Sequence, residues 1–460
     1  MTAELIAAFA AIVGQAHVRT DEDARQRYGV DALQIGHPAD LVVLPAGTEE
    51  IAGIARLCNA HRIPLVVRGA GTGYTGGAVP VHGGVVVSME RLNRILEIDE
   101  DNLLAVVQPN VITRALQDAV EARGLFYPPD PSSLNQSSLG GNVAECAGGP
   151  RAVKYGTTKR YVLALEAVLP TGEIVRTGSK AVKNVVGYDL TQLLVGSEGT
   201  LAVITEITLR LVPKPAVQAT IQATFSNIDA AVRAVSLLLA ARVVPATIEL
   251  IDEVSLAAVA RRLNRPVAPQ GTGAMLIIEV DGVPAGVEEE AARVTSACQA
   301  AGALSLTRSE TAEERDRVWE ARRELSFALR ALAPRKINHD VVVPRGRVPQ
   351  LFALIADIRK RYRLQIPCFG HAGDGNIHVN LMVDPADADE MQRASSAERE
   401  LFEGVVALEG SISGEHGIGF AKARYLNLEL SPDAIALMRR VKLAFDPHQI
   451  LNPGKLWDAD

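Results

Sequence analysis

Hydrophobic and polar positions in the first half of the chain alternate between short β-branched runs and longer helical patterns. The runs "ADLVVLPAG" (39–47) and "IPLVVRG" (63–69) predict strands, and the stretch between them predicts a helix with Thr48 as its N-cap. Further strands are expected within 83–89, 103–109, 162–178 and 201–213, the third run with a hairpin turn at 170–173. This half therefore predicts short strands connected by helices and loops.

A proline-punctuated stretch, "PKPAV" at 213–217, indicates a domain boundary. Beyond it the pattern predicts a second α/β unit with strands at 219–225, 245–252 and 274–282, a helix at 228–241 and a polar helix around 311–332. Helical periodicity returns from about 390 and is interrupted at 410–419. We expect an α+β protein in three parts: 1–216, 217–400 with an antiparallel sheet, and a helical segment, 401–460, that packs back on the first part.

Composition and charge narrow the function classes. A chain of 460 residues exceeds what one hydrophobic core usually supports. The net charge of −7 and the lack of a long Lys/Arg run argue against a nucleic-acid partner. No apolar run is long enough for a membrane span, and the apolar start lacks the basic flank and cleavage site of a leader. Four widely spaced cysteines argue against an iron–sulfur cluster, a zinc ribbon or a disulfide framework, and favour a cytoplasmic location: Cys58, Cys146, Cys298 and Cys368.

The stretch "VVRGAGTGYTGGAVP" (66–80) has the G-x-G-x-x-G spacing of a dinucleotide site, and Glu90 lies about where a ribose-binding acid would be expected. A dinucleotide site of that kind needs a helix directly after the glycines, because the pyrophosphate binds at its N-terminus. Pro80 and the Gly83-Gly84 pair leave no room for such a helix. Two interpretations remain: a backbone anion nest between two strands, with Arg68 adding charge, or a turn that binds nothing.

Two other glycine-rich loops favour the nest. Residues 128–162 form a long polar stretch without periodicity, as functional loops often do. The stretch 193–213 has a Gly-Ser-Glu-Gly loop near its start, at 196–199, and passes directly into a strand. Three such loops in one half of the chain could surround a single large polar ligand.

The stretch "CFGHAGDGNIHVN" (368–380) carries separate chemistry. If Asp374-Gly375 is a two-residue hairpin turn, His371 lies directly opposite His378, with Cβ atoms about 5 Å apart, close enough to share one cation. Asn380 then shares their face. Two histidines at this spacing are by themselves more often ordinary core or surface residues.

The loop "GSISGEHGIG" (410–419) adds a carboxylate and a third histidine. His371, His378 and Glu415 make a two-histidine, one-carboxylate set typical of a divalent catalytic site with open positions. His416 is then available as a general base.

Several of these stretches resemble one superfamily. The loops at 66–77, 128–158 and 193–211 and the hairpin "LPTGEIVRTG" are similar to the FAD-binding domain of the vanillyl-alcohol-oxidase/p-cresol-methylhydroxylase superfamily. Within it, from about Asp40 to Leu456, the chain resembles FAD-linked 2-hydroxy-acid dehydrogenases: D-lactate dehydrogenases, D-2-hydroxyglutarate dehydrogenases and the flavin subunit of glycolate oxidase. The resemblance implies that 1–216 binds FAD and that 217–400 is a substrate-binding cap domain.

The resemblance assigns cofactor residues one by one. The pyrophosphate loop would be Arg68, Gly69, Ala70, Gly71, Thr72 and Gly73, continued by Thr75, Gly76 and Gly77. The isoalloxazine ring and ribityl chain would lie against Pro129, Asp130, Ser132, Ser138, Gly140, Gly141, Asn142 and Gly148. Glu198, Gly199 and Ile204 would lie near the adenine half, and Asn452 and Lys455 would return to the flavin. Because 66–80 and 128–162 contain no histidine, we expect non-covalent FAD.

The same resemblance assigns His371, His378 and Glu415 to the metal, zinc or else manganese or iron, and the catalytic role to His416. The segment 318–344 is similar to one that binds the substrate carboxylate, through Arg322, Ser326 and Lys336, with Asn380 as a further substrate contact. Alternatively, Arg322 and Arg323 belong to an ordinary solvated helix face. The "INH" after Lys336 departs from the pattern of hydroxyglutarate enzymes.

These observations predict FAD-dependent, metal-assisted oxidation of a D-2-hydroxy acid to the 2-oxo acid. Electrons would pass to an acceptor other than oxygen: a quinone, a cytochrome, an electron-transfer flavoprotein or a partner subunit. The alternatives are a metal-free FAD-dependent alcohol oxidase, a metallohydrolase without flavin, and a non-catalytic subunit. A homodimer and a hetero-oligomeric complex are both compatible with the sequence, as is attachment to the inner face of a membrane.

Overall fold

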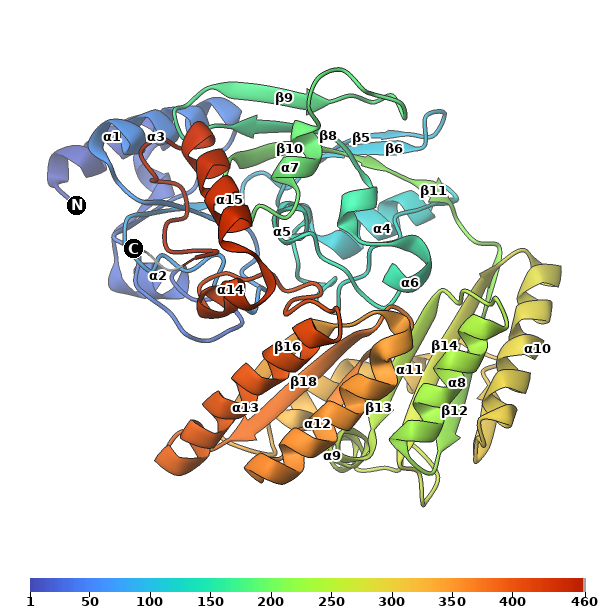
Figure 1. Ribbon diagram of the computed structural model, residues 1–460. Helices are drawn as coiled ribbons and strands as arrows, with labels where there is room; N and C mark the ends of the chain where they lie inside the picture. Colours follow the sequence, from blue (N-terminus) through green and yellow to red (C-terminus); the bar gives the residue numbers. More distant parts are fainter. Residues whose placement is uncertain (458–460) are drawn as a thin grey trace. The chain divides into compact units, whose positions relative to one another are not determined.

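The computed structural model describes residues 1–457, which form two compact units (Figure 1). Unit 1 contains Met1–Gly148, Thr157–Lys214 and the C-terminal stretch from Glu415. Unit 2 contains Gly149–Gly156 and Pro215–Gly414. The chain therefore leaves unit 1 next to the prolines of "PKPAV" and returns to it inside the loop that carries Glu415 and His416.

Unit 1 is built on two main sheets. The first has the order β1 (Val18–Arg19), β2 (Leu41–Val43), β4 (Val85–Ser88), β3 (Leu65–Arg68), with β2 and β3 parallel to β4. The second is antiparallel, with the order β5 (Ile95–Asp99), β6 (Leu104–Val107), β10 (Val203–Arg210), β8 (Val162–Val168), β9 (Ile174–Gly178). Strands β7 (Leu125–Phe126) and β11 (Val212–Pro213) pair separately. The helices are α1 (Ala3–Val13), α2 (Glu22–Arg27), α3 (Thr48–His61), α4 (Thr113–Glu121), α5 (Leu139–Glu145), α7 (Leu190–Leu194), α14 (Leu426–Glu429) and α15 (Pro432–Phe445).

The core of the first sheet explains why these strands carry so many β-branched residues. Val85 and Val87 of β4 are fully buried in one cluster with Phe9 of α1 and Ile51 and Ile54 of α3. A strand buried by its neighbours reads as a continuous apolar run, which is what "VVVS" shows. The sheet and its covering helices thus form a firm base for the loops that follow β3 and β4.

Two local predictions in unit 1 can be compared with the structure. The hairpin at 170–173 is confirmed, since Val168 pairs with Ile174 across β8 and β9. The N-cap prediction for Thr48 is wrong: Gly47 is the N-cap, and Thr48 is the first helical residue. The Thr48 hydroxyl donates instead to the Glu166 carboxylate at 2.7 Å, so a tertiary partner replaces the local one.

The loop after β3 contains no helix. Residues 69–84, all of which the structure describes, are turns and irregular backbone that lead directly into β4. The dinucleotide-helix interpretation is therefore excluded by the structure, for the reason that Pro80 and the Gly83-Gly84 pair indicated.

Unit 2 is one antiparallel sheet with helices on both faces. The strand order is β15 (Ser305–Arg308), β12 (Val217–Phe225), β14 (Ala274–Gly282), β13 (Thr247–Asp252), β17 (Cys368–His371), β18 (Asn376–Val383), β16 (Arg335–Val342). The helices are α6 (Ala152–Tyr155), α8 (Ile228–Ala240), α9 (Glu253–Leu263), α10 (Pro284–Ala300), α11 (Ala312–Leu329), α12 (Val348–Tyr362) and α13 (Ala388–Ala407). In Figure 1, α8, α12 and α13 lie on one face of this sheet and α9 and α11 on the other.

Strand alternation divides the side chains of this sheet between the two faces. Ile251 of β13 and Phe369 of β17 pack with Leu325 of α11, whereas Val379 and Leu381 of β18 lie with residues of α12 and α13. The even-numbered residues of β18 therefore point to the face that α11 covers. That face includes both histidines of the 368–380 stretch.

Candidate active site

The glycines of the first loop bring two segments of unit 1 together. A Cβ on Gly69 would lie 2.3 Å from the Ser138 hydroxyl, and the backbone N–H of Ala70 donates to the same hydroxyl at 3.3 Å. Ser138 also caps α5 by accepting from the Gly141 N–H at 3.4 Å. The loop at 66–80 and the loop at 128–162 thus meet through the backbone of Gly69 and Ala70 and the side chain of Ser138. Close approach of glycine-rich backbone is a feature of pyrophosphate-binding loops.

The Arg68 guanidinium already has protein partners. Its guanidinium donates to the Val30 carbonyl at 2.6 Å, and a buried carboxylate, Asp31, lies nearby. Burial raises the pKa of Asp31 to about 6, although the N–H groups of Leu33 and Gly76 and the charge of Arg68 lower it. The sequence had not indicated Asp31, because it lies in an irregular segment far from the glycines.

The C-terminal residues reach the same region. The Asn452 amide donates to the carbonyls of Gly77 and Glu198, both at 2.8 Å. The Lys455 ammonium donates to the Val79 carbonyl at 2.7 Å, and burial lowers its pKa to about 8. The Glu198 carboxylate accepts from backbone N–H groups at 418 and 419. The first loop, the 198 loop and the chain end therefore converge within unit 1, as a wrapped polar ligand requires.

The remaining predicted cofactor residues differ in position. Asn142 is buried and donates to the Thr113 hydroxyl at 2.7 Å, and the Pro129 carbonyl accepts from Gln117 at 2.9 Å. Ser132 is exposed, and Ile204 lies within β10, paired with Ala167. The other members lie in the loops described above or beside them: Ala70, Thr72, Gly73, Thr75, Gly76, Asp130, Gly140, Gly141, Gly148 and Gly199. We call the loops at 66–80 and 128–162, which meet at Gly69 and Ser138, the glycine cradle. This cradle, rather than any charged side chain, is the feature that fits FAD.

The histidine hairpin has a different register from the one expected. His371 pairs with Asn376, and His378 pairs with Phe369. The prediction of a two-residue turn is wrong, because the connection has four residues, 372–375, closed by the N–H groups of Asp374 and Gly375 donating to the His371 carbonyl. The two histidines are diagonal neighbours instead of direct partners.

The shift of register keeps both histidines on one face. It displaces the partner by two residues, and side chains alternate with a period of two, so the face does not change. The two imidazole rings lie 5.3 Å apart, centroid to centroid, at an interplanar angle of 81°. Both side chains are buried. The pair is therefore close enough to share one cation. The sequence predicted this proximity from direct cross-strand pairing, whereas the two histidines are diagonal neighbours.

A buried carboxylate supports this pair. Glu249 of β13 lies opposite His371 in the sheet, and its carboxylate contacts His371 Nδ1 and Arg322 Nε. Burial opposes ionisation of Glu249, but Arg322 and His371 outweigh it and hold the pKa of Glu249 at about 2. Sequence reasoning missed this residue; the available signal was a lone carboxylate inside the apolar run "ATIELI".

The predicted substrate residues lie on the same face. Arg322 of α11 is buried, with its guanidinium 4.8 Å from the centre of the Phe369 ring, so the solvated-helix alternative is wrong for Arg322. Its Nη2 has no hydrogen-bond partner among the described residues. Lys336 of β16 donates to the Ser326 hydroxyl at 2.7 Å, and burial lowers the pKa of Lys336 to about 8.

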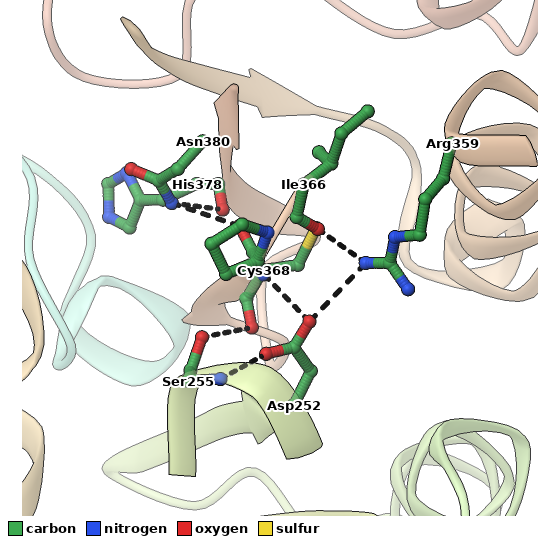
Figure 2. A network of polar contacts seen from close by, with 8 residues as sticks. Asp252, Ser255, Arg359, Ile366, Cys368, His378 and Asn380 are labelled. Atoms are coloured by element: carbon green, nitrogen blue, oxygen red, sulfur yellow. Dashed lines mark hydrogen bonds and ion pairs between the residues drawn. The ribbon is translucent and has the colours of Figure 1, made fainter. Parts of the chain in front are cut away.

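Asn380 lies deeper than a ligand contact would require. Its amide donates to the carbonyls of Pro367 and His378, both at 3.2 Å, and Figure 2 shows the contact with His378. Its carbonyl oxygen accepts from Asn338 at 2.7 Å. In this position Asn380 connects β18 to the residue just before β17 and to β16.

A second network holds β17 in place. Figure 2 shows the Asp252 carboxylate between three groups: it accepts from the backbone N–H of Ser255 and of Cys368, both at 2.9 Å, and from Arg359 at 3.5 Å. Burial raises the pKa of Asp252, while these donors lower it. Asp252 thereby connects the start of α9 to the first residue of the strand that ends in His371.

The loop before Glu415 is anchored to β16. The Gly414 N–H donates to the carboxylate of Asp340 at 3.0 Å, and Asp340 lies opposite His378 in the sheet. Glu415 is the next residue in the chain. The hydrogen bond between Gly414 and Asp340 therefore also restricts the position of the Glu415 backbone. The ligand atoms of His371, His378 and Glu415 lie within 4.8 Å of one another, a spacing that one metal ion could span.

His416 is held by residues of the first glycine loop. Its carbonyl accepts from the Thr75 hydroxyl at 3.1 Å, and its ring lies 5.2 Å from the Tyr74 ring. Its Nε2 is 3.7 Å from the Glu415 carboxylate. The candidate base and the candidate third ligand are thus adjacent both in the chain and in space.

Comparison with known protein families identifies the class. Residues 39–178 match the family described as "FAD binding domain", and residues 214–456 match "FAD linked oxidases, C-terminal domain". The chain belongs to the FAD-linked oxidases, and it is an FAD-binding oxidoreductase. The superfamily predicted from the sequence is confirmed.

Individual relatives agree with this assignment. The chain is 45% identical to "Glycolate oxidase subunit GlcD" of Bacillus subtilis, over 94% of this chain and 92% of that protein. It is 34% identical to "D-lactate dehydrogenase" of Anaerostipes hadrus, over 99% and 98%. Among solved structures, p-cresol methylhydroxylase with substrate bound superposes with a TM-score of 0.82 at 19% identity, covering 99% of this chain and 96% of that one. The last comparison shows the fold alone.

No helix among residues 1–457 is long and apolar enough to cross a membrane.

Proposed function

We propose that this protein oxidises a D-2-hydroxy acid to the corresponding 2-oxo acid, with non-covalent FAD and a divalent cation. The observation that carries the proposal is the set of His371, His378 and Glu415 with His416 directly beside it. Relatives named glycolate oxidase subunit and D-lactate dehydrogenase support the class of substrate. Glycolate, D-lactate and D-2-hydroxyglutarate are the candidate substrates.

In this proposal, unit 1 binds the cofactor and unit 2 binds the substrate carboxylate. The glycine cradle of unit 1 holds FAD, and unit 2 supplies Arg322 and Lys336 to bind the substrate carboxylate. Bound FAD supplies the hydride acceptor at flavin N5. A cation held by His371, His378 and Glu415, zinc or else manganese or iron, supplies a positive charge that acidifies the substrate hydroxyl.

The reaction removes a proton from the hydroxyl and a hydride from C2, leaving a carbonyl at C2. His416 accepts the proton, since an imidazole is suited to proton transfer near neutral pH. Arg322 and Lys336 bind the acid by its carboxylate and so limit its orientation. Electrons leave through an acceptor other than oxygen, either a partner subunit or a diffusible carrier. Four free, widely spaced cysteines favour a cytoplasmic setting for these steps.

A substrate panel with an artificial electron acceptor tests the proposal. Purified yellow protein is assayed with glycolate, both enantiomers of lactate and of 2-hydroxyglutarate, and a simple primary alcohol. We expect turnover of a D-2-hydroxy acid or glycolate, loss of turnover after chelation, and recovery when zinc or manganese is added back. Full activity in verifiably metal-free protein would instead favour a metal-free flavin oxidase. A colourless protein that binds no FAD would favour a metallohydrolase.

A further inference from the structure

One buried carboxylate connects two groups that the proposed reaction needs. Glu249 lies on β13, next to β17 in the sheet, and is fully buried. One carboxylate oxygen contacts His371 Nδ1 and the other contacts Arg322 Nε. The three residues are far apart in sequence, so only the sheet order and the position of α11 bring them together.

The contact with Glu249 determines the tautomer and the ring orientation of His371. A carboxylate at Nδ1 favours the imidazole tautomer with its proton on Nδ1, and this leaves the lone pair of Nε2 for a cation. The contact also limits rotation of the ring about its side-chain bonds. His371 is thereby prepared as a ligand before a cation arrives.

The same carboxylate determines the orientation of the Arg322 guanidinium. Glu249 takes the Nε donor, and the guanidinium lies over the Phe369 ring at 4.8 Å. Nη2 is buried and has no hydrogen-bond partner among the residues that the structure describes. A guanidinium fixed on one side in this way has its Nη2 available for an anion.

We propose that Glu249 is a positioning residue that holds the cation ligand His371 and the carboxylate-binding Arg322 in one rigid unit. The affinity for the cation and the affinity for the hydroxy acid then depend on the same side chain. This proposal rests on the proposed function and adds a residue to its site. The competing view is that Glu249 is only half of a buried ion pair that stabilises the sheet.

The chain offers a matched control in Glu279. It lies on the neighbouring strand β14, diagonal to Glu249 and therefore on the same face, since Glu279 pairs with Thr247 and Glu249 pairs with Ile277. Its carboxylate accepts from the Thr220 hydroxyl at 2.6 Å and from Trp319 Nε1 at 2.7 Å. Glu279→Gln therefore changes a mostly buried carboxylate of the same sheet that contacts partners other than His371 and Arg322.

The test is a zinc titration of FAD-loaded, chelator-stripped protein against a competing chromophoric chelator, in the absence of substrate. We expect Glu249→Gln to weaken zinc affinity about 10- to 100-fold, as loss of a carboxylate behind a metal-binding histidine typically does. Glu279→Gln should stay within about twofold of wild type. At saturating zinc, Glu249→Gln should also raise KM for the best acid of the panel more than it lowers kcat.

The outcomes separate the two proposals. If wild type binds no zinc, manganese or iron, the proposed cation site is wrong. If wild type binds zinc and folded Glu249→Gln binds it equally well, the role of Glu249 is wrong while the proposed function stands. If Glu249→Gln does not fold, the double variant Glu249→Gln/Arg322→Gln removes both charges and leaves neither one buried alone. Unchanged zinc affinity in that variant would likewise overturn the role of Glu249.

Discussion

His371 and His378 lie on the same face of one sheet with their rings 5.3 Å apart, although neither is the direct cross-strand partner of the other. Their separation depends on a four-residue connection that places His371 opposite Asn376. A connection one residue longer or shorter would turn one histidine to the opposite face. The geometry of this short turn therefore controls whether the two rings can share a cation.

Replacing Gly375 tests the turn directly. Gly375 has a φ of +88°, and a Cβ there would lie 2.1 Å from the Val343 carbonyl oxygen. We expect Gly375→Ala to destabilise the protein by about 1–3 kcal/mol, because it adds left-handed strain to a backbone clash. Gly271→Ala is the matched control, since Gly271 has a φ of +84° and open space around it. Thermal unfolding decides: equal losses of Tm in the two variants would show that the contact with Val343 has no effect.

Lys336 predicts a pH dependence of substrate binding. Burial lowers the pKa of Lys336 from 10.5 to about 8, so the ammonium is present below pH 8 and lost above it. KM for the acid should therefore rise as the pH passes through about 8, and Lys336→Met should remove this rise. Stability changes in the opposite direction: a lysine with a lowered pKa in the folded state adds stability as the pH rises from about 8 towards 10.5. Lys360→Met, at an exposed position, is the control, and a KM that does not change with pH in wild type would contradict the prediction.

His416→Ala tests the assignment of the base. We expect kcat to fall about 100- to 10,000-fold while the protein keeps its yellow flavin, because a positioned base typically contributes that much. The comparison is His61→Ala, an exposed residue at the end of α3. Turnover is followed with an artificial electron acceptor, and flavin content by absorbance. Near-wild-type turnover in the flavin-loaded variant would remove His416 from the base role.

Gly69→Ala tests the cofactor cradle. A Cβ at residue 69 would lie 2.3 Å from the Ser138 hydroxyl, so the first two glycine-rich loops would have to move apart. We expect the variant to lose FAD on dilution and to be purified with less bound flavin than wild type. Gly346→Ala, where nothing lies within 4 Å of an added Cβ, should retain its flavin. Normal flavin retention in Gly69→Ala would mean that the approach of these loops does not hold the cofactor.

The chemistry of the two sites could be predicted from short stretches of sequence. Pro80 and the Gly83-Gly84 pair excluded a helix after the first glycines, because backbone preferences act over a few residues. Alternation with a period of two placed His371, His378 and Asn380 on one face, and this survived an error in the turn. The N-cap assigned to Thr48 failed because Glu166, far along the chain, provided a better partner for its hydroxyl.

Local pattern by itself determined which residue types could act and on which face of a strand they would lie. Only the tertiary structure decided which of them would meet. Glu249 contacts His371 because β13 is the neighbour of β17, and it contacts Arg322 because α11 covers that face of the sheet. Strand order and helix placement result from the burial of the whole core, for example Ile251 and Phe369 against Leu325. Such contacts between distant segments leave no periodic signal in the sequence, so the partner of a buried carboxylate appears only once the core is packed.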